Sequence, residues 1–257
     1  MPATVTLLTD YGLQDEYVGV CHGVIARIAP EARVIDLTHG VPRHAIRSGA
    51  LALRRALPFT PSGVHVAVVD PGVGGPRRGI AVRCGGDRLL VGPDNGLLMP
   101  AAEHLGGVEE AVDLASSPWL LEPVSATFHG RDVFAPVAAH LALGEPLARA
   151  GEPLPVDPLV ALALPEPRRE GIALVAHALA FDTYGNVLLD ASTGDLPPGE
   201  RVEVAGRWVA RGRTFGDVPD GELLLYEDSS GALALAVNGG SARDELNLRL
   251  DDEIRIA

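Results

Sequence analysis

The sequence contains no lysine, and all 21 of its basic residues are arginine. Without lysine the chain cannot form a Schiff base through a side chain, anchor pyridoxal phosphate or supply the lysine of a P-loop. The GxSxG, HExxH, CxxC and GxGxxG motifs are also absent. These gaps exclude several large classes of hydrolase, metalloprotease, redox and dinucleotide-binding sites.

Cysteine, positive charge and long hydrophobic runs are scarce as well. Cys21 and Cys84 are too few for a disulfide framework, and we expect two buried thiols. The net charge of −13 argues against a nucleic-acid partner, since phosphate backbones need a basic face. No apolar segment is long enough to span a bilayer, and the N-terminus does not resemble a signal peptide. We therefore expect a cytoplasmic protein with neither a membrane nor a nucleic acid as partner.

Hydrophobic patterning in the first half alternates between strands and helices. Continuous apolar runs predict strands that are buried on both faces, and apolar residues at helical spacing predict helices between them. Such repeats imply an α/β domain with a mostly parallel sheet, in which ligands bind outside the carboxyl ends of the strands. The predicted strands are 5–9, 33–37 and 64–70, and the predicted helices are 15–30, 44–57 and 131–144.

The pattern changes after residue 152. A proline-rich stretch, 153–170, is typical of a linker. Short strands separated by turns fill 171–257 and predict an all-β, barrel-like C-terminal domain. The expected organisation is thus an α/β domain at 1–152, a linker at 153–170 and a β-barrel domain at 171–257.

Polar residues directly follow several predicted strands. Asp10, Asp70 and Asp182 each end an apolar run, and Ser229 follows another. Any one of them is readily explained as a turn or helix cap, but several at strand ends favour a site. The stretch from Val68 to Val82 leaves two interpretations open: a surface hairpin with a salt bridge, or a catalytic site at a strand end.

A second polar cluster lies in "TFHGRDVFAP", which contains His129, Arg131 and Asp132. His129 stands at a loop-to-helix junction, and Asp132 is equally explained as the cap of the following helix. A carboxylate, a guanidinium and an imidazole together can orient and deprotonate a water molecule.

Six motifs carry a resemblance over nearly the whole chain: "LTDYG…DEYVG", "DLTHGVP", "VVDPGVG", "TFHGRDVFAP", "DTYGN" and "SSGALALAVN". They resemble the S-adenosyl-L-methionine (SAM) hydroxide adenosyltransferases, adenosine-forming SAM hydrolases related to fluorinase and chlorinase. The resemblance implies an α/β domain followed by a β-barrel domain. It also implies a homotrimer, with sites between the N-terminal domain of one subunit and the C-terminal domain of its neighbour.

The resemblance also implies roles for individual residues. It assigns water activation to Asp70, Arg77 and His129; Arg78 is the alternative to Arg77, which the spacing from Asp70 favours. It implies ribose binding by Asp10 and places the remaining contacts around the substrate: Asn186 and Asn238 at adenine, Asp182 and Ser229 at the methionine amine and carboxylate, and Tyr184, Phe215 and Phe59 packed against the nucleoside.

One departure from the halogenases bears on the reaction. Where fluorinases carry a Tyr-Ser pair after "TF", this chain has His129 and Gly130, so the halide-holding serine is missing. The expected reaction is hydrolysis of SAM to adenosine and L-methionine, with SAM as substrate and without cofactor or metal. Three alternatives stay open: a chlorinase-like halogenase, a metal-dependent hydrolase built on His39, His44, His129 and the strand-end aspartates, and a non-catalytic adenosine- or SAM-binding regulatory protein.

Overall fold

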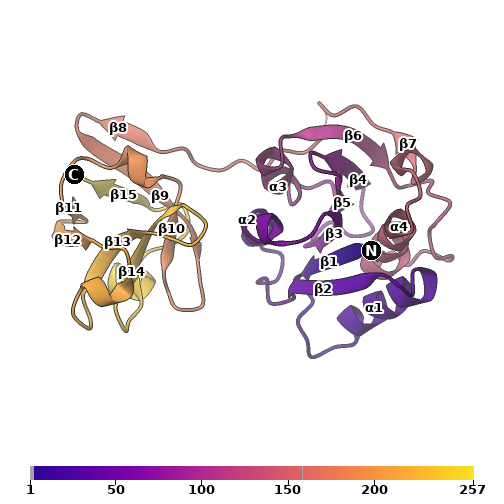
Figure 1. Cartoon of the computed structure of the whole chain (residues 1–257), viewed down its shortest axis with the longest axis horizontal. Coiled ribbons are helices and arrows are strands. Elements are labelled where there is room, and N and C mark those ends of the chain that lie inside the picture. The colour runs from indigo at the N-terminus through magenta and orange to yellow at the C-terminus, as the bar shows by residue number, and fades with distance from the viewer. Residues whose placement is uncertain (1–2, 158) are drawn as a thin grey trace. The chain divides into compact units, whose positions relative to one another are not determined.

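The computed structural model describes residues 3–157 and 159–257 of the chain. The chain divides into two compact units, the first ending at Leu162 and the second beginning at Ala163. Figure 1 shows a layered α/β arrangement in the first unit and a barrel of strands in the second. The expected fold class is confirmed.

The first unit is built on a seven-stranded sheet with the order β2-β1-β3-β5-β4-β6-β7. The first four strands in this order are parallel, whereas β4 runs antiparallel to both β5 and β6, and β7 antiparallel to β6. The strands are β1 (Thr4–Thr9), β2 (Arg33–Thr38), β3 (Gly63–Val68), β4 (Gly79–Cys84), β5 (Arg88–Pro93), β6 (Val108–Asp113) and β7 (Glu152–Pro153).

Helices cover both faces of this sheet, as the continuous apolar strands predict. On β3, Val64, Val66 and Val68 pack into a core with α1 and α4, while Ala67 packs into a second core with α2 and α3. Figure 1 shows these helix pairs on opposite sides of the sheet. The helices are α1 (Tyr17–Ile28), α2 (Ile46–Ala56), α3 (Met99–His104) and α4 (Ala135–Ala142), with a π-helical turn at Gly130–Phe134 directly before α4.

The segment that connects β3 to β4 is not a hairpin. Strand β3 pairs with β1 and β5, and β4 pairs with β5 and β6, so the two strands are not neighbours. The loop instead crosses the carboxyl edge of the sheet before the chain re-enters it at Gly79. This geometry removes the surface-hairpin interpretation of the stretch from Val68 to Val82.

The proline-rich stretch at 153–170 is divided between the two units. Leu154, Leu159 and Leu162 pack against the α2–α3 core, and the amide of Val160 donates to Asp94 Oδ1 at 2.8 Å. At its other end, strand β8 (Arg168–Glu170) pairs with β9 in the second unit. The unit boundary consequently falls inside this stretch, between Leu162 and Ala163.

The second unit is a closed barrel of seven strands in the order β10-β14-β13-β12-β11-β15-β9, completed by the pairing of β9 with β10. Alternating side chains such as Leu174, Ala176 and Ala178 fill its core, as expected for strands with one inward face. The elements are β9 (Ala173–Phe181), β10 (Val187–Leu189), β11 (Arg201–Val204), β12 (Arg207–Arg211), β13 (Leu223–Glu227), β14 (Leu233–Val237), the short helix α5 (Ala242–Glu245) and β15 (Glu253–Ile256).

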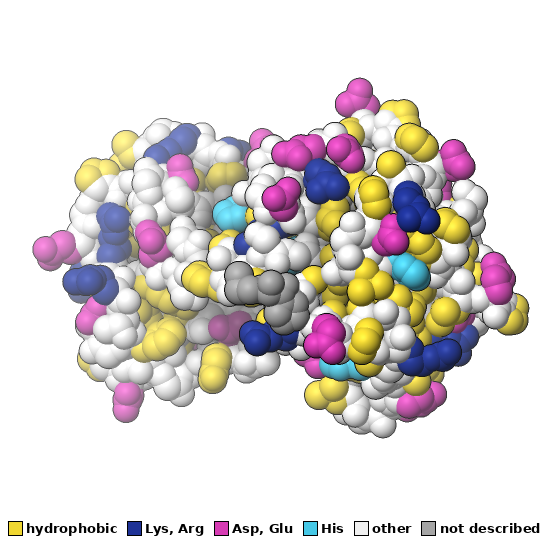
Figure 2. Space-filling view, turned by 45° about the vertical axis from the view of Figure 1, so that its right-hand side comes forward, with side chains coloured by type: hydrophobic (Ala, Val, Ile, Leu, Met, Phe, Trp, Pro, Cys, Tyr) yellow, Lys and Arg dark blue, Asp and Glu magenta, His cyan; other side chains and the backbone are white. Residues whose placement is uncertain are grey.

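Both cysteines are buried and unpaired, as predicted. Burial raises the pKa of the Cys21 thiol to about 12 and that of Cys84 to about 11, so neither is a reactive thiolate. On the face shown in Figure 2, dark-blue arginine side chains lie among magenta carboxylates. Across the described residues, no helix is long and apolar enough to cross a bilayer.

Candidate active site

Three side chains predicted as a set meet at the carboxyl end of β3. Arg77 Nε donates to Asp70 Oδ1 at 2.9 Å and Oδ2 at 3.0 Å, and its Nη2 also donates to Oδ2. The same Nη2 lies 2.7 Å from Nδ1 of His129. The Asp70 and Arg77 side chains are only 5% and 12% exposed, so this ion pair is largely shielded from water. Arg77 thereby joins a carboxylate and an imidazole that are 59 positions apart in sequence.

The glycine-rich loop after β3 leaves room for the Arg77 side chain beside Asp70. A Cβ on Gly72 would lie 3.2 Å from Cγ of Arg77, so a larger residue would crowd the arginine stem. Gly74 has φ +75, a conformation that L side chains rarely adopt, and a Cβ there would collide with the carbonyl oxygen of Ala126. Gly74 is therefore required by the path of the backbone, whereas a larger residue at Gly72 would require the Arg77 side chain to shift.

Arg78 takes a different partner from its neighbour. Its Nε donates to Asp94 Oδ2 at 3.0 Å, and its Nη2 donates to the same oxygen at 2.5 Å. Asp94 Oδ1 accepts a hydrogen bond from the amide of Val160. Arg77 is thus the arginine in contact with Asp70, whereas Arg78 belongs to the packing of the first unit.

A cavity of about 680 Å³ opens beside this cluster. Asp10, the ribose-binding residue implied by the resemblance, lies on its wall and accepts a hydrogen bond at Oδ2 from the amide of His44 at 2.9 Å. The volume of the cavity falls within the usual range for small-molecule sites. The lining residues are Asp10, Tyr11, Asp15, Glu16, Tyr17, Val20, Arg43, His44, Val68, Asp70, Val73, Ser125, Thr127, Phe128, His129, Gly130 and Arg131.

Sequence reasoning missed an aromatic wall of this cavity. The ring centroids of Tyr11 and Tyr17 lie 5.9 and 5.2 Å from that of Phe128, both in edge-on geometry, and the two tyrosine rings are tilted against each other at 5.9 Å. The three rings offer an apolar surface suited to a flat heterocycle. The available signal was their place inside the quoted motifs "LTDYG", "DEYVG" and "TFHG".

Electrostatics bias His129 toward its neutral form. Burial lowers the pKa of His129, and the adjacent Arg77 cation lowers it further, against the opposing pull of Asp70 and Asp132. Because a guanidinium only donates, His129 Nδ1 accepts from Arg77, and a neutral ring then carries its proton on Nε2. Asp132 is separately engaged with Arg131 and the amide of Ser125 and is 2% exposed.

In the second unit, the "DTYGN" segment forms the turn between β9 and β10. Asp182 Oδ1 accepts from the amides of Tyr184 and Asn186, both at 2.9 Å, and Oδ2 accepts from Asn186 Nδ2 at 2.7 Å. Gly185 has φ +80, and a Cβ there would strike Ser241. Asp182 therefore orders the turn, and Tyr184 projects from it with 77% of its surface exposed.

The remaining C-terminal candidates lie on other loops of the barrel. Phe215 is 43% exposed and packs edge-on against Tyr226, with centroids 5.4 Å apart. Asn238 Nδ2 donates to the carbonyl of Val218 at 2.9 Å, and Ser229 lies exposed at the tip that follows β13.

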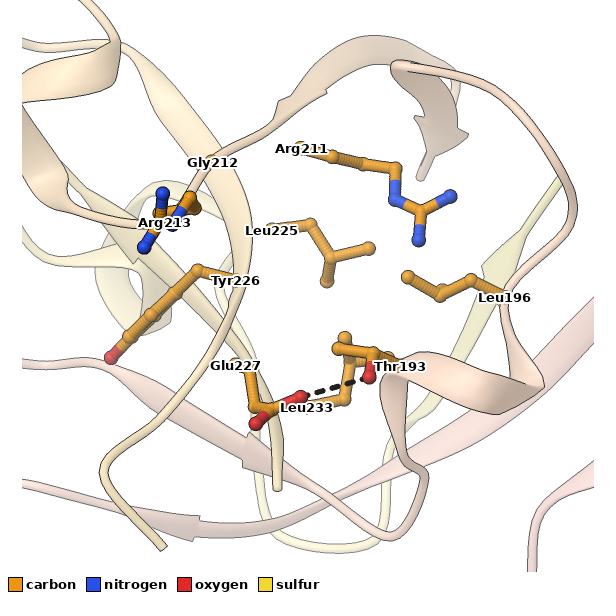
Figure 3. Close-up of a pocket in the computed structure, with 9 residues that line it drawn as sticks. All are labelled: Thr193, Leu196, Arg211, Gly212, Arg213, Leu225, Tyr226, Glu227 and Leu233. Atoms are coloured by element: carbon orange, nitrogen blue, oxygen red, sulfur yellow. Dashed lines mark hydrogen bonds between the residues drawn. The ribbon is translucent and has the colours of Figure 1, made fainter. Parts of the chain in front are cut away.

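The barrel also contains a pocket of about 400 Å³, which none of the predicted site residues lines. Figure 3 shows the Arg211 guanidinium extending toward Leu196, with Arg213 and Tyr226 on the other side of the pocket. Between them, Thr193 Oγ1 donates to Glu227 Oε2 at 2.8 Å. Tyr226, which lines this pocket, packs against the predicted residue Phe215.

Phe59 is not brought to the cavity of the first unit. It ends the 3₁₀ turn Leu57–Phe59 before β3, at the amino edge of the sheet, with 80% of its surface exposed. Asp10 and Asp70 follow their strands at the opposite, carboxyl edge. Its predicted packing against the nucleoside therefore gains no support within this unit.

The histidines proposed for a metal-dependent hydrolase do not form one cluster. Within 3–157 and 159–257, the single group of three metal-ligating side chains comprises His22, Asp36 and His39. Neither His44 nor His129 belongs to it. His44 instead lies at φ 64 with its amide held by Asp10, and His129 contacts Arg77.

Comparisons with known proteins agree with this architecture. The family model for the SAM hydroxide adenosyltransferase N-terminal domain matches residues 5–151, and that for the C-terminal domain matches 176–255. The chain belongs to the SAM hydroxide adenosyltransferase family.

Individual relatives refine the comparison. An (R)-S-adenosyl-L-methionine hydrolase from Salinispora tropica is 53% identical over 98% of this chain and 97% of its own. A crystal structure of an uncharacterized conserved protein from Thermotoga maritima has a TM-score of 0.89 at 40% identity, covering 98% of this chain and 99% of its own. A fluorinase from Actinoplanes sp. is more distant, 26% identical over 97% of both chains.

Proposed function

We propose that this protein hydrolyses (R)-S-adenosyl-L-methionine to adenosine and L-methionine. The observation that carries the proposal is the Asp70–Arg77–His129 cluster beside the cavity, in a chain 53% identical to a protein named as this hydrolase. SAM is the substrate, and the proposal includes no cofactor. Buried, unpaired Cys21 and Cys84 suit a reducing compartment, so we place the enzyme in the cytoplasm.

The cluster can activate water with a defined division of roles. Arg77 donates to Nδ1 of His129, so Nε2–H of the neutral imidazole is free to donate a hydrogen bond to the water oxygen. Asp70, held in place by Arg77, is the carboxylate that accepts a proton from that water. The arginine is a positioning group that sets the geometry of both partners.

The bond changes balance without an added acid. The water oxygen forms a bond to C5′ of the ribose as the bond from C5′ to sulfur breaks. The electron pair of the broken bond neutralises the sulfonium, so methionine leaves as a neutral thioether. The proton lost by water passes to Asp70 and then to solvent. Most of the required catalysis is thus positioning of water opposite the leaving sulfur.

Substrate binding draws on both units. Asp10 presents its carboxylate to the ribose hydroxyls, and the rings of Tyr11, Tyr17 and Phe128 offer a surface for the nucleoside. We assign the remaining contacts to the second unit of a neighbouring subunit in a homotrimer. They come from Asp182, Tyr184, Asn186, Phe215, Ser229 and Asn238.

The direct test is product analysis. Purified protein is incubated with SAM in halide-free buffer and again with chloride or fluoride, followed by chromatography for nucleosides. We expect adenosine and methionine in equal amounts under all three conditions. Accumulation of a 5′-halogenated deoxyadenosine would assign a halogenase instead, and binding of SAM without turnover would assign a regulatory protein.

The first variant to make is Asp70→Ala. Loss of the proton acceptor should lower the rate of adenosine formation by roughly 10²–10⁴-fold, while the affinity for adenosine, measured by calorimetry, stays close to that of the wild type. Asp157→Ala, which removes an exposed carboxylate, is the matched control. Turnover near the wild-type rate in folded Asp70→Ala would remove Asp70 from the mechanism.

A further inference from the structure

Away from the cavity, three metal-ligating side chains converge from two neighbouring elements. His22 lies on α1, Asp36 on β2, and His39 directly after β2. His22 Nε2 is 2.8 Å and His39 Nε2 is 3.0 Å from the same carboxylate oxygen, Asp36 Oδ1. The candidate ligand atoms all lie within 4.8 Å of one another. None of the three residues lines the cavity beside Asp70.

His39 Nε2 is the anomalous atom in this cluster. The His39 side chain is only 3% exposed, and although Nε2 points at Asp36 it has no partner with hydrogen-bond geometry. The other ring nitrogen, Nδ1, lies 2.8 Å from Oγ1 of Thr9. A buried polar atom without a well-aligned hydrogen bond costs stability unless something else satisfies it.

We propose that His22, Asp36 and His39 bind one divalent transition-metal ion of the Zn²⁺ type. Two imidazole nitrogens and one carboxylate oxygen form a donor set typical of such ions. The His22 and Asp36 side chains are 37% and 41% exposed, so the site opens to solvent on one side. Water can enter there as the fourth ligand and complete a tetrahedral shell.

Thr9 acts as the outer partner of this site. With Nε2 on the metal, His39 carries its proton on Nδ1 and donates it to Thr9 Oγ1, which fixes the tautomer and the plane of the ring. Thr9 Oγ1 also accepts from the amide of Tyr11 at 3.2 Å, and the carbonyl of His39 accepts from the amide of Gly12 at 2.9 Å. The ion would therefore brace the loop that carries Asp10 and Tyr11, without touching substrate.

Metal binding can be measured independently of SAM hydrolysis. Tag-free, chelator-treated protein is dialysed against Zn²⁺ and the bound metal is counted by mass spectrometry. Titration with Co²⁺ reports the geometry, because four-coordinate Co²⁺ absorbs strongly in the visible. We expect one ion per chain, visible bands of a tetrahedral site, and a higher melting temperature with metal than without.

Variants at the two exposed ligands test the assignment. His22→Gln and Asp36→Asn should each weaken Zn²⁺ binding by roughly 10-fold or more and abolish the metal-dependent rise in melting temperature. His104→Gln, which removes an exposed histidine at the end of α3, should bind as the wild type does. Circular dichroism verifies folding of each variant.

Two results would overturn the proposal. One is wild-type protein that binds no stoichiometric metal, which would leave the cluster as a plain His–Asp–His network. The other is a stoichiometric ion that both ligand variants retain at unchanged affinity. The hydrolase proposal is tested separately, because product analysis identifies adenosine and methionine whether or not an ion is bound at this cluster.

Discussion

At the scale of single residues, the two adjacent arginines after the glycine loop have separate tasks. Arg77 contacts both Asp70 and His129, whereas Arg78 pairs with Asp94, whose carboxylate also holds Val160. Of these contacts, only those of Arg77 with Asp70 and His129 involve residues of the proposed reaction. Substitution of each arginine should therefore affect a different measured quantity.

Arg77→Lys should lower kcat by roughly 100-fold, because a lysine cannot hold both carboxylate oxygens of Asp70 and reach His129 as well. Arg78→Lys should lower the melting temperature and leave kcat close to the wild-type value. Steady-state kinetics and thermal melts on both variants check the pair. Equal losses of kcat in the two would contradict the separation of tasks.

Gly130 is a second residue with a measurable constraint. A Cβ at Gly130 would collide with the hydroxyl of Tyr11, so Gly130→Ser should destabilise the fold and should not confer halogenation. Tyr11→Phe removes the colliding oxygen and leaves two ring carbons at 3.2 Å, a tight contact that a shift of a few tenths of an ångström relieves. The double variant should recover part of the lost stability, measured as a non-zero coupling energy in urea denaturation. Strict additivity would show that Tyr11 is not the obstacle.

At the scale of elements, strand β3 carries a buried histidine beside its apolar residues. His65 is fully buried between Thr6, at 3.0 Å from its Nδ1, and Arg88, at 3.3 Å from its Nε2. Burial lowers the pKa of His65 to about 4, and the Arg88 cation contributes in the same direction. The folded state therefore holds this imidazole neutral, whereas the unfolded chain protonates it near pH 6.5.

This difference predicts acid sensitivity with a definite sign. The unfolded state binds more protons between pH 6.5 and about 4, so His65 contributes about 3 kcal/mol above this window, and that contribution is lost as the pH falls through it. Urea unfolding between pH 7 and pH 4.5 measures the slope. His65→Gln should be less stable at pH 7 but should lose less stability on acidification. Parallel curves for the two proteins would contradict this assignment.

Sequence patterning predicted those elements whose signal is local. The apolar runs located β1, β2 and β3, and helical spacing located α1 and α2 to within a few residues. The second helix starts at Ile46 rather than His44, because the amide of His44 is held by Asp10 across the sheet edge. The exchange of β4 and β5 in the sheet order depends on tertiary pairing, which no single strand encodes.

The site residues also differ in how far the sequence predicts them. Asp70, Arg77 and His129 were identified by resemblance, and their mutual contacts agree with the predicted set. The aromatic wall formed by Tyr11, Tyr17 and Phe128 was not predicted, because its rings come from three segments that meet only in the folded unit. Whether the C-terminal candidates contact substrate remains a prediction.

At the scale of the whole molecule, each proposed site combines the first unit of one subunit with the second unit of its neighbour. One subunit would supply Asp10, Asp70, Arg77 and His129, and its neighbour would supply the barrel residues. Head-to-tail contacts in a closed ring permit such sharing, with one complete site at each interface. On this scheme, neither set of residues forms an active site without the other.

Mixing two inactive variants tests the scheme. Asp70→Ala and Asn186→Ala are co-refolded in equal amounts, and subunit exchange is verified with two different tags. Random mixing should leave about a quarter of the interfaces with both halves intact, and so about a quarter of the wild-type activity. Each variant refolded alone is the control. Verified exchange without recovered adenosine formation would place the whole site within one chain.

Closure of the barrel also sets an order of events during protein synthesis. Strand β9, the first of the seven closing strands to be synthesised, pairs with β15, the last of them. Until Glu253–Ile256 has left the ribosome, one edge of β9 lacks its partner on that side, and the ring stays open. The α/β unit has by then already been translated through its final strand, β7. The unit that contains Asp70, Arg77 and His129 is thus fully translated before the barrel of the same chain can close.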